Sequence, residues 1–340
     1  MDEILIIILL TLLLSGTGSW FLTGLLRKYA VRKKIFDIPN QRSSHKIPIP
    51  RGGGVAIVFT FVIGAVLLFL LGKLDLNAII GLSGAGILVG LVGFKDDRGH
   101  VSLVWRLLVH FLAVIWGVAW LGNAFAKLPN EMMHFNSLFL PVEIIFLVWV
   151  LNLFNFMDGI DGIAASETLF VAGCGLLFST LTGNADQQLV AILLIGATFG
   201  FLLWNWPPAK IFMGDAGSGF LGITLGLYAY WTATGDVVTF WTWAIIMGVF
   251  LVDATFTLFR RILRKQRWYE AHRSHAYQHA AQRWGHLPVT MSVTFINIFW
   301  LLPIAYFSNQ YRDRGPELMI LALTPLIVLA FILGAGKETQ

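Results

Sequence analysis

Three short acidic clusters follow or precede apolar stretches of this sequence, and their side chains are well suited to chemistry. The first holds Asp96 and Asp97, the second (residues 155–162) holds two further aspartates, and the third (residues 212–218) holds Asp215. A carboxylate is expensive to move into hydrocarbon. We therefore expect the three clusters to meet in one charged site at the surface of a membrane.

Composition indicates the class of protein. Hydrophobic residues make up 57% of the 340 residues and charged residues only 13%, whereas a soluble domain carries about 25% charged residues. This balance indicates a polytopic membrane protein. It argues against a large soluble helical protein, because one core could not hide so much apolar surface. The single cysteine, Cys174, excludes an internal disulfide.

Eleven apolar segments could form transmembrane helices, each of which needs roughly 20 residues. They are residues 4–26, 52–71, 78–94, 103–121, 137–155, 163–182, 188–206, 216–232, 239–259, 290–307 and 317–336. The sequence shows no convincing internal repeat. It therefore predicts an all-α membrane protein with about 11 transmembrane helices and a single domain over residues 1–340.

The distribution of Lys and Arg predicts the orientation. Alternate loops on one side of the eleven segments hold 20 of the 24 basic residues, and such loops are normally cytoplasmic. The N-terminus is then expected to be periplasmic and the C-terminus cytoplasmic. All three acidic clusters fall on the cytoplasmic side, although nothing in the apolar pattern required it.

The paired carboxylates of the first cluster repel each other unless a positive group lies near. Mg²⁺ or a basic group would serve, and the alternative is a solvated turn before Arg98. In the second cluster, Asn152, Asn155, Asp158 and Asp161 recur at every third residue. If helical, neighbouring members share a face, and together they could bind a base edge, a ribose or a metal-bound phosphate.

The third cluster combines an acidic side chain with a predicted helix start. Asp215 lies between Gly214 and Gly217, glycine lets the backbone approach a phosphate closely, and a helix start offers unpaired N–H groups to an anion. Phe212 could stack on a ring. The simpler alternative is that Asp215 is an ordinary N-cap.

Two long basic loops accompany these clusters. Residues 37–54 are stiffened by proline and end in three glycines, which suits anion capture or anchoring to anionic membrane lipids. Residues 272–286 hold four histidines with two arginines. Cysteine is absent there and arginine favours phosphate, so phosphate binding or lipid anchoring is preferred to a transition-metal site.

These motifs together resemble the polyprenyl-phosphate N-acetylhexosamine-1-phosphate transferases, an MraY/WecA-like superfamily also called glycosyltransferase family 4. The resemblance covers nearly the whole chain, from DIPN at 37–40 to the histidine loop. Three stretches look like the WbpL-type branch, whose members start O-antigen chains, often with deoxy-amino sugars. These stretches are SSHK at 43–46, PRGGG at 50–54 and RSHAYQH at 273–279.

The resemblance implies an enzyme that transfers a sugar 1-phosphate to undecaprenyl phosphate and releases UMP. The donor would be a UDP-N-acetylhexosamine or UDP-deoxy-N-acetylhexosamine, and the cofactor Mg²⁺, which Mn²⁺ could replace. The reaction would start a lipid-linked O-antigen or cell-surface polysaccharide at the cytoplasmic face of the bacterial inner membrane. Relatives also imply a homodimer, and nucleic acid is not an expected partner.

Matching motif positions implies a role for each candidate residue. The metal ligand would be Asp215, and the catalytic acids would be Asp96, Asp97 and Asp158. The substrate-binding residues would be Lys46, Arg51, Asn155, Asp161, Asn205, Phe212, His272, Arg273 and His275. The family's histidine loop usually reads His-x-His-His, whereas this chain has HRSH at 272–275, which leaves open the histidine that binds pyrophosphate.

The chemistry itself leaves two routes. The lipid phosphate is already largely ionised near neutral pH, so its repulsion from an anionic diphosphate is the main obstacle, and a divalent cation with basic loops addresses it. An acidic residue could remove the last proton or attack first and form a covalent intermediate. Direct attack is preferred, because a carboxylate nucleophile adds no electrostatic advantage.

Rival functions predict other features. A secondary transporter would place charges near the middle of the bilayer, between repeats, whereas the acidic clusters here lie at one face. A lipid-binding protein without catalysis would be expected to have lost some of these motifs. The three acidic clusters and the two basic loops all look intact. A CDP-alcohol phosphotransferase would need a different continuation of Asp158-Gly159.

Overall fold

The structure is a computed structural model that describes residues 3–39, 45, 47–99, 101–122, 133–267 and 272–337. The described chain is almost entirely helical, which confirms the all-α prediction. Its α-helices are α1 (Glu3–Arg32), α2 (Val55–Leu70), α3 (Leu76–Asp96), α4 (Leu103–Leu121), α5 (Met133–Met157), α6 (Ile163–Leu181), α7 (Ala185–Asn205), α8 (Asp215–Thr234), α9 (Phe240–Ile246), α10 (Gly248–Leu263), α11 (Ala276–Trp284), α12 (His286–Ile296), α13 (Leu302–Gln310) and α14 (Gly315–Ile332). Helices satisfy their own backbone groups, which hydrocarbon requires.

Each of the eleven expected segments contains helix, but the segments differ in form. Within the described residues, eight helices are long and apolar enough to cross a membrane, or nine if one bent pair counts as a span. That pair is α9 and α10, which meet at Met247 with an angle of 81°, where we expected one continuous span over residues 239–259. The shorter α2 has 16 residues. The total of about eleven spans stays a prediction.

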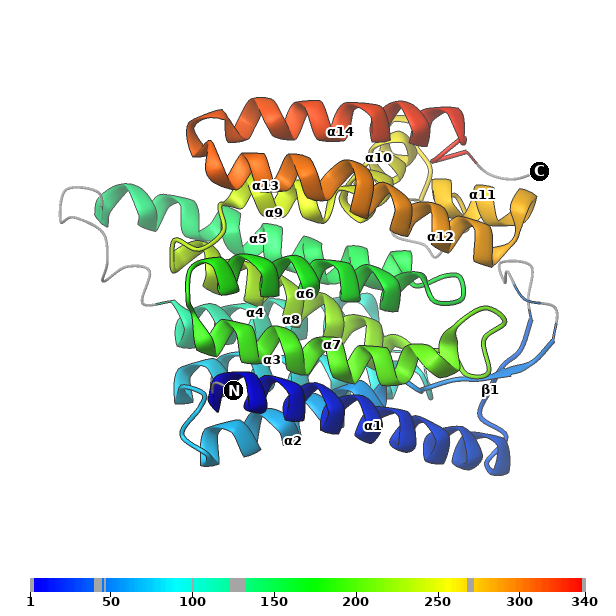
Figure 1. Cartoon of the computed structure of the whole chain (residues 1–340). Coiled ribbons are helices and arrows are strands. Elements are labelled where there is room, and N and C mark those ends of the chain that lie inside the picture. The colour runs from blue at the N-terminus through cyan, green and yellow to red at the C-terminus, as the bar shows by residue number, and fades with distance from the viewer. Residues whose placement is uncertain are drawn as a thin grey trace.

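A π-helical turn, a 3₁₀ turn and two short strands complete the described architecture. The π-turn (Asn297–Leu301) joins α12 to α13, and a short 3₁₀ turn (Arg312–Arg314) precedes α14. The strands β1 (Phe36–Asp37) and β2 (Ile49–Pro50) form an antiparallel hairpin in the first basic loop. This hairpin projects from one end of the helix bundle (Figure 1).

Helix α8 is the central element of the bundle. Every residue from Ala216 to Tyr230 is buried, which is expected of a helix that is apolar all round. Its principal neighbours are α3 and α5, the helices that end in the first two acidic clusters. A Cβ atom on Gly93 of α3 would lie 2.4 Å from the carbonyl oxygen of Asp215. Glycine is therefore required for α3 to approach the start of α8 this closely.

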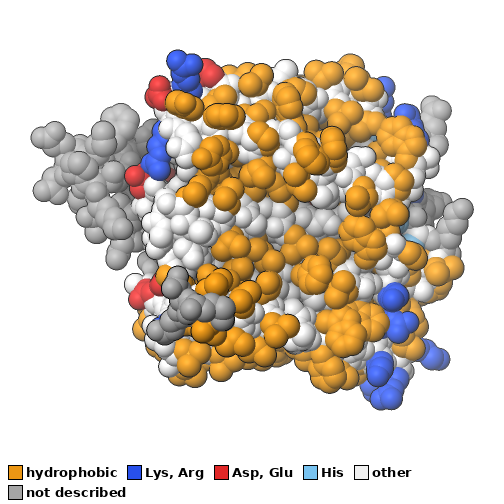
Figure 2. All heavy atoms as spheres, viewed as in Figure 1, with side chains coloured by type: hydrophobic (Ala, Val, Ile, Leu, Met, Phe, Trp, Pro, Cys, Tyr) orange, Lys and Arg blue, Asp and Glu red, His pale blue; other side chains and the backbone are white. Residues whose placement is uncertain are grey.

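The surface divides into an apolar band and two polar ends. Figure 2 shows hydrophobic side chains over the middle of one face and most charged side chains at its two edges. At one end lie β1, α11 and the end of α14 (Figure 1). At the other, the backbone N–H of Asp75 before α3 donates to Asp186 at the start of α7. This pattern supports a bundle whose helices run from one membrane face to the other.

Single-cysteine labelling tests which end faces the cytoplasm. The native Cys174 is buried, so an impermeant maleimide should react only with an introduced, exposed cysteine. We expect Gly99→Cys and Arg264→Cys to be labelled only after the inner face is opened, because they lie at the end that carries the acidic clusters. Thr182→Cys and Asp313→Cys should be labelled in intact cells. Labelling of all four from the same side would contradict the fold.

Candidate active site

The first and third acidic clusters are in direct contact. Asp97 directly follows α3, and its two carboxylate oxygens accept hydrogen bonds from the backbone N–H groups of Asp215 (2.9 Å) and Ala216 (3.3 Å). These N–H groups belong to the first turn of α8, where the helix dipole favours a negative charge. The Asp97 side chain is only 6% exposed. One member of the acidic pair therefore caps the helix that begins with the third cluster.

Arg51 from the first basic loop joins the same two carboxylates. Its Nε lies 2.8 Å from Asp97 Oδ1, and its Nη2 lies 2.6 Å from Asp215 Oδ1. Burial raises the pKa of Asp97, and the Arg51 guanidinium acts in the opposite direction to limit this rise. For Arg51, burial acts to lower the pKa, but Asp215 and Asp97 outweigh it and the pKa is raised. The guanidinium is therefore held charged between the two acids.

Asp96 has a different partner from its neighbour. Its Oδ2 lies 2.7 Å from Nη1 of Arg106, and its Oδ1 accepts the backbone N–H of Val101 at 2.8 Å. Arg106 also approaches Asp215 Oδ2, at 4.0 Å. The repulsion between the adjacent carboxylates is thus offset by two separate arginines. Arg106 was not among the predicted site residues, because it stands alone near the start of an apolar segment.

Backbone hydrogen bonds fix Arg51 in place. Arg51 forms a parallel bridge with Phe212, and the N–H groups of Gly52 and Gly53 donate to the Phe212 carbonyl at 3.1 and 2.9 Å. A Cβ atom on Gly54 would lie 2.4 Å from the Cα of Gly217. The glycines at the end of the basic loop therefore let it lie directly against the third cluster.

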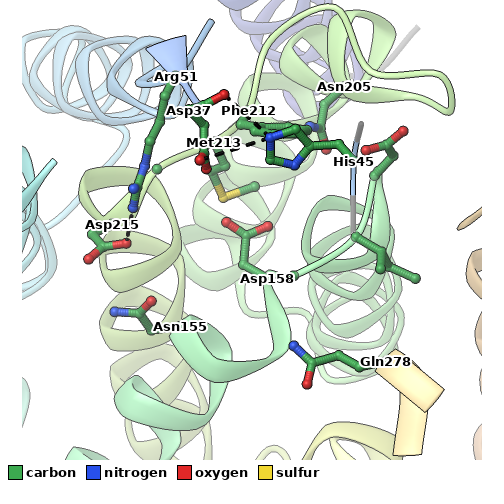
Figure 3. A pocket seen from close by; sticks show the side chains of 14 residues that line it. Asp37, His45, Arg51, Asn155, Asp158, Asn205, Phe212, Met213, Asp215 and Gln278 are labelled. Carbon is green, nitrogen blue, oxygen red and sulfur yellow. Dashed lines mark hydrogen bonds and ion pairs between the residues drawn. The ribbon is translucent and has the colours of Figure 1, made fainter. Parts of the chain in front are cut away.

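The second cluster forms the opposite wall of a cavity of about 280 Å³. Asp158 lies immediately after α5 and points into this cavity, across from Asp215 and Arg51 (Figure 3). Burial raises the pKa of Asp158 well above its usual value. The nearby carboxylates raise this pKa further, whereas the Arg51 guanidinium acts to lower it. The cavity is lined by Asp37, His45, Arg51, Asn155, Asp158, Gly159, Ile160, Asp161, Asn205, Phe212, Met213, Gly214, Asp215 and Gln278.

Two predicted substrate-binding residues also hold loops together. The Asn205 carboxamide accepts from the N–H of Gly162 (2.9 Å) and donates to the carbonyl of Ile211 (3.0 Å). Asp161 accepts from the N–H of Ala209 at 3.0 Å, and its other oxygen lies 3.1 Å from Nδ1 of His286. Both residues line the cavity, but in this structure these polar atoms contact protein groups.

Three predicted residues of the histidine loop fall outside the cavity wall. His275 is 3% exposed and contacts Asp253, and neither it nor His272 or Arg273 is among the lining residues. Lys46 lies outside the described residues. Asn152 of the second cluster donates to the carbonyl of Val148 one turn earlier in α5.

Three lining residues with polar side chains were not among the predicted site residues. Asp37 and His45 come from the first basic loop, and His45 packs edge-on against Phe212 with ring centroids 4.9 Å apart. Gln278 comes from α11, one turn after His275. Their position was the one sequence feature that could have identified them, because each lies in a loop with other residues that were predicted to bind substrate.

The donor set fits a cation that is shared with substrate. No group of three or more His, Cys, Asp or Glu side chains suited to a metal occurs among the residues that the structure describes. Mg²⁺, however, commonly uses one or two carboxylates and completes its shell with phosphate oxygens and water. Asp215 faces the cavity, and the Asn155 carboxamide lies beside it (Figure 3). These oxygens suit Mg²⁺ bound together with a diphosphate.

Comparison with known proteins identifies the family. Residues 79–233 match the model of glycosyl transferase family 4. The chain is 30% identical over 305 residues to a "Probable undecaprenyl-phosphate N-acetylglucosaminyl 1-phosphate transferase" of Bacillus subtilis, covering 87% of this chain and 83% of the relative. An undecaprenyl-phosphate alpha-N-acetylglucosaminyl 1-phosphate transferase of Thermotoga maritima is 27% identical, with 86% and 90% covered.

A relative with a different named substrate matches a shorter part of the chain. The phospho-N-acetylmuramoyl-pentapeptide-transferase of Pelagibacter ubique is 30% identical over 249 residues, with 64% of this chain and 67% of the relative covered. The matches therefore include relatives named for different transferred sugar groups. Together with the geometry, they establish that the chain belongs to glycosyl transferase family 4, the polyprenyl-phosphate N-acetylhexosamine-1-phosphate transferases.

Proposed function

We propose that this protein transfers an N-acetylated amino-sugar 1-phosphate from a UDP-sugar to undecaprenyl phosphate and releases UMP. The observation that carries the proposal is the cavity in which Arg51, Asp158 and Asp215 face one another. It combines a cation, a carboxylate with a raised pKa and a carboxylate suited to Mg²⁺ at the ends of membrane helices. Those are the groups that two anionic reactants need.

The nucleotide has a candidate binding wall. Phe212 and His45 present aromatic rings at one side of the cavity, and Asn155 and Arg51 lie toward Asp215 (Figure 3). We assign the uracil ring to the aromatic side and the diphosphate to the side with Arg51. In this assignment, Mg²⁺ on Asp215 would neutralise phosphate charge and make UMP a better leaving group.

The reaction replaces one phosphoanhydride by another. An oxygen of the lipid phosphate forms a bond to the phosphorus that carries the sugar, and the bond from that phosphorus to the UMP oxygen breaks. The electron pair of the broken bond leaves with UMP. Asp158 is our candidate to accept a remaining proton from the lipid phosphate, because its raised pKa makes it a stronger base than an ordinary carboxylate. We favour this direct attack over a covalent intermediate.

An apolar groove could hold the prenyl chain. A cavity of about 560 Å³ lies between α5, α8, α9 and α10, and its lining includes Leu153, Gly226, Met247 and Leu251. The lining residue Val142 is 60% exposed, so the groove opens to the outside of the bundle. Helices α5 and α8 carry the second and third acidic clusters at their ends. A chain lying along them would keep its phosphate near the active site.

The biological setting follows as a further part of the proposal. The sequences of the two basic loops support a WbpL-type enzyme that starts an O-antigen or another cell-surface polysaccharide. Its donor would be a UDP-N-acetylhexosamine or a UDP-deoxy-N-acetylhexosamine, with Mg²⁺ or Mn²⁺ as the cofactor. We place the active site at the cytoplasmic face of the inner membrane, among membrane lipids, in a homodimer.

UMP release by purified protein tests this function. We expect release only when a UDP-N-acetyl sugar and undecaprenyl phosphate are both present, and we expect EDTA to abolish it until Mg²⁺ is restored. A panel of UDP-sugars would identify the donor. Sugar movement across vesicles without UMP release would instead support a transporter.

Asp215→Asn tests the acidic centre directly. Loss of the carboxylate should lower kcat by roughly 100-fold or more, the scale expected when charge stabilisation of a transition state is lost. Asp236→Asn is the matched control, because Asp236 is exposed and pairs with Arg312 near the start of α9. The control should retain normal turnover. Normal turnover by Asp215→Asn would remove Asp215 from the site.

Leu251→Trp tests the prenyl groove. The larger side chain should narrow the groove and raise the KM for undecaprenyl phosphate several-fold, while the KM for a ten-carbon prenyl phosphate and for the UDP-sugar should change little. The measurement is steady-state kinetics with both lipids. Equal effects on the long and short lipids would place the chain elsewhere.

A further inference from the structure

A buried carboxylate outside the cavity holds the start of α11. Asp253 of α10 is 6% exposed, and its two oxygens accept hydrogen bonds from the N–H groups of Ala276 and Tyr277, each at 2.9 Å. The same carboxylate lies 3.3 Å from Nδ1 of His275 and accepts the hydroxyl of Thr257 at 3.1 Å. A side chain from one helix thus caps another helix.

Helix α11 contacts the acidic loop that follows α5. The phenol of Tyr277 donates to the carbonyl of Phe156 at 2.9 Å. A Cβ atom on Gly159 would lie 2.1 Å from this phenol oxygen, so the backbone beside Asp158 fits closely against Tyr277. The next residue, Gln278, lines the cavity near Asp158 (Figure 3).

The far side of the same loop is held by α12. The hydroxyl of Thr290 donates to the carbonyl of Asp161 at 3.0 Å, and His286 approaches the Asp161 side chain at 3.1 Å. The loop that carries Asp158 is therefore contacted on one side by the first turn of α11 and on the other by α12. A shift of that first turn would move Tyr277, Gln278 and the backbone next to Asp158 together.

We propose that Asp253 is a positioning residue for the transfer reaction, acting through α11 on Asp158 and Gln278. This inference rests on the proposed function, because it assigns Asp253 an effect on the chemical step. Asp253 is not among the residues that line the active-site cavity, so we place its effect on the positions of other groups. Its two oxygens receive two separate N–H groups, which fixes both the direction and the rotation of the first turn.

The carboxylate is suited to this task in a way that its amide is not. Asparagine has one acceptor oxygen, and its NH₂ group would face either Ala276 N–H or Tyr277 N–H, donor against donor. Asp253→Asn therefore preserves the volume of the side chain but removes half of the cap. Tyr277→Phe preserves the ring and removes the hydroxyl that donates to the Phe156 carbonyl and interacts with the Gln278 side chain.

The experiment compares Asp253→Asn, Tyr277→Phe and the double variant with wild type in the UMP-release assay. We expect each single variant to lower kcat by roughly 10- to 100-fold, because small displacements of catalytic groups have effects of this size, and to change the KM for undecaprenyl phosphate less than twofold. The double variant should be no slower than the slower single variant, because both changes act through α11. Asp75→Asn is the matched control: Asp75 also caps a helix, α3, at the opposite end, and this variant should turn over normally.

Several results would overturn the proposal. Losses that multiply in the double variant would show that Asp253 does not act through Tyr277, and an equal loss in Asp75→Asn would show only a general cost of an altered cap. If Asp253→Asn does not accumulate as folded protein, Tyr277→Phe alone decides, and normal kinetics in it overturns the idea. Absence of UMP release by wild type would refute the proposed function instead, and so separates the two failures.

Discussion

The contact of Arg51 with Asp97 and Asp215 is the interaction on which the geometry of the site depends. It joins the first basic loop, the end of α3 and the start of α8, which come from three distant parts of the chain. Burying two carboxylates without a partner would be strongly unfavourable, and removing one partner of such a group leaves an uncompensated charge. The position of each segment is therefore tied to the other two.

This ion-pair cluster has a second electrostatic support. The carboxylate of Asp97 also accepts N–H groups at the start of α8, so the helix end and the guanidinium stabilise the same charge. Asp215 then projects from a helix whose following residues are buried and whose neighbours approach through glycine contacts. A rigid central helix holds the candidate metal ligand, while loops supply the groups around it.

The sequence was sufficient to predict the helical fold and the convergence of the acidic clusters, because both follow from where charge can lie relative to hydrocarbon. It could not predict the bend at Met247, since the apolar pattern continues through it. Asn205 illustrates a second limit: an amide that could bind a base can equally bind Gly162 N–H and the Ile211 carbonyl. The capping role of Asp253 could not be predicted for a related reason. Asp253 lies within a predicted membrane segment, and the N–H groups that it accepts come from a later part of the chain.

The arrangement of charges also suits the two anionic reactants of the proposed reaction. Arg51 is directed at two carboxylates, and Asp96 has its own arginine. A guanidinium presents several N–H donors in a fixed plane, so it can retain carboxylate contacts while it binds a phosphate. The two acids hold Arg51 charged and oriented. Asp158 lies on the opposite wall, and among the described residues it forms no ion pair like those of Asp96, Asp97 and Asp215, so burial and the neighbouring carboxylates raise its proton affinity further.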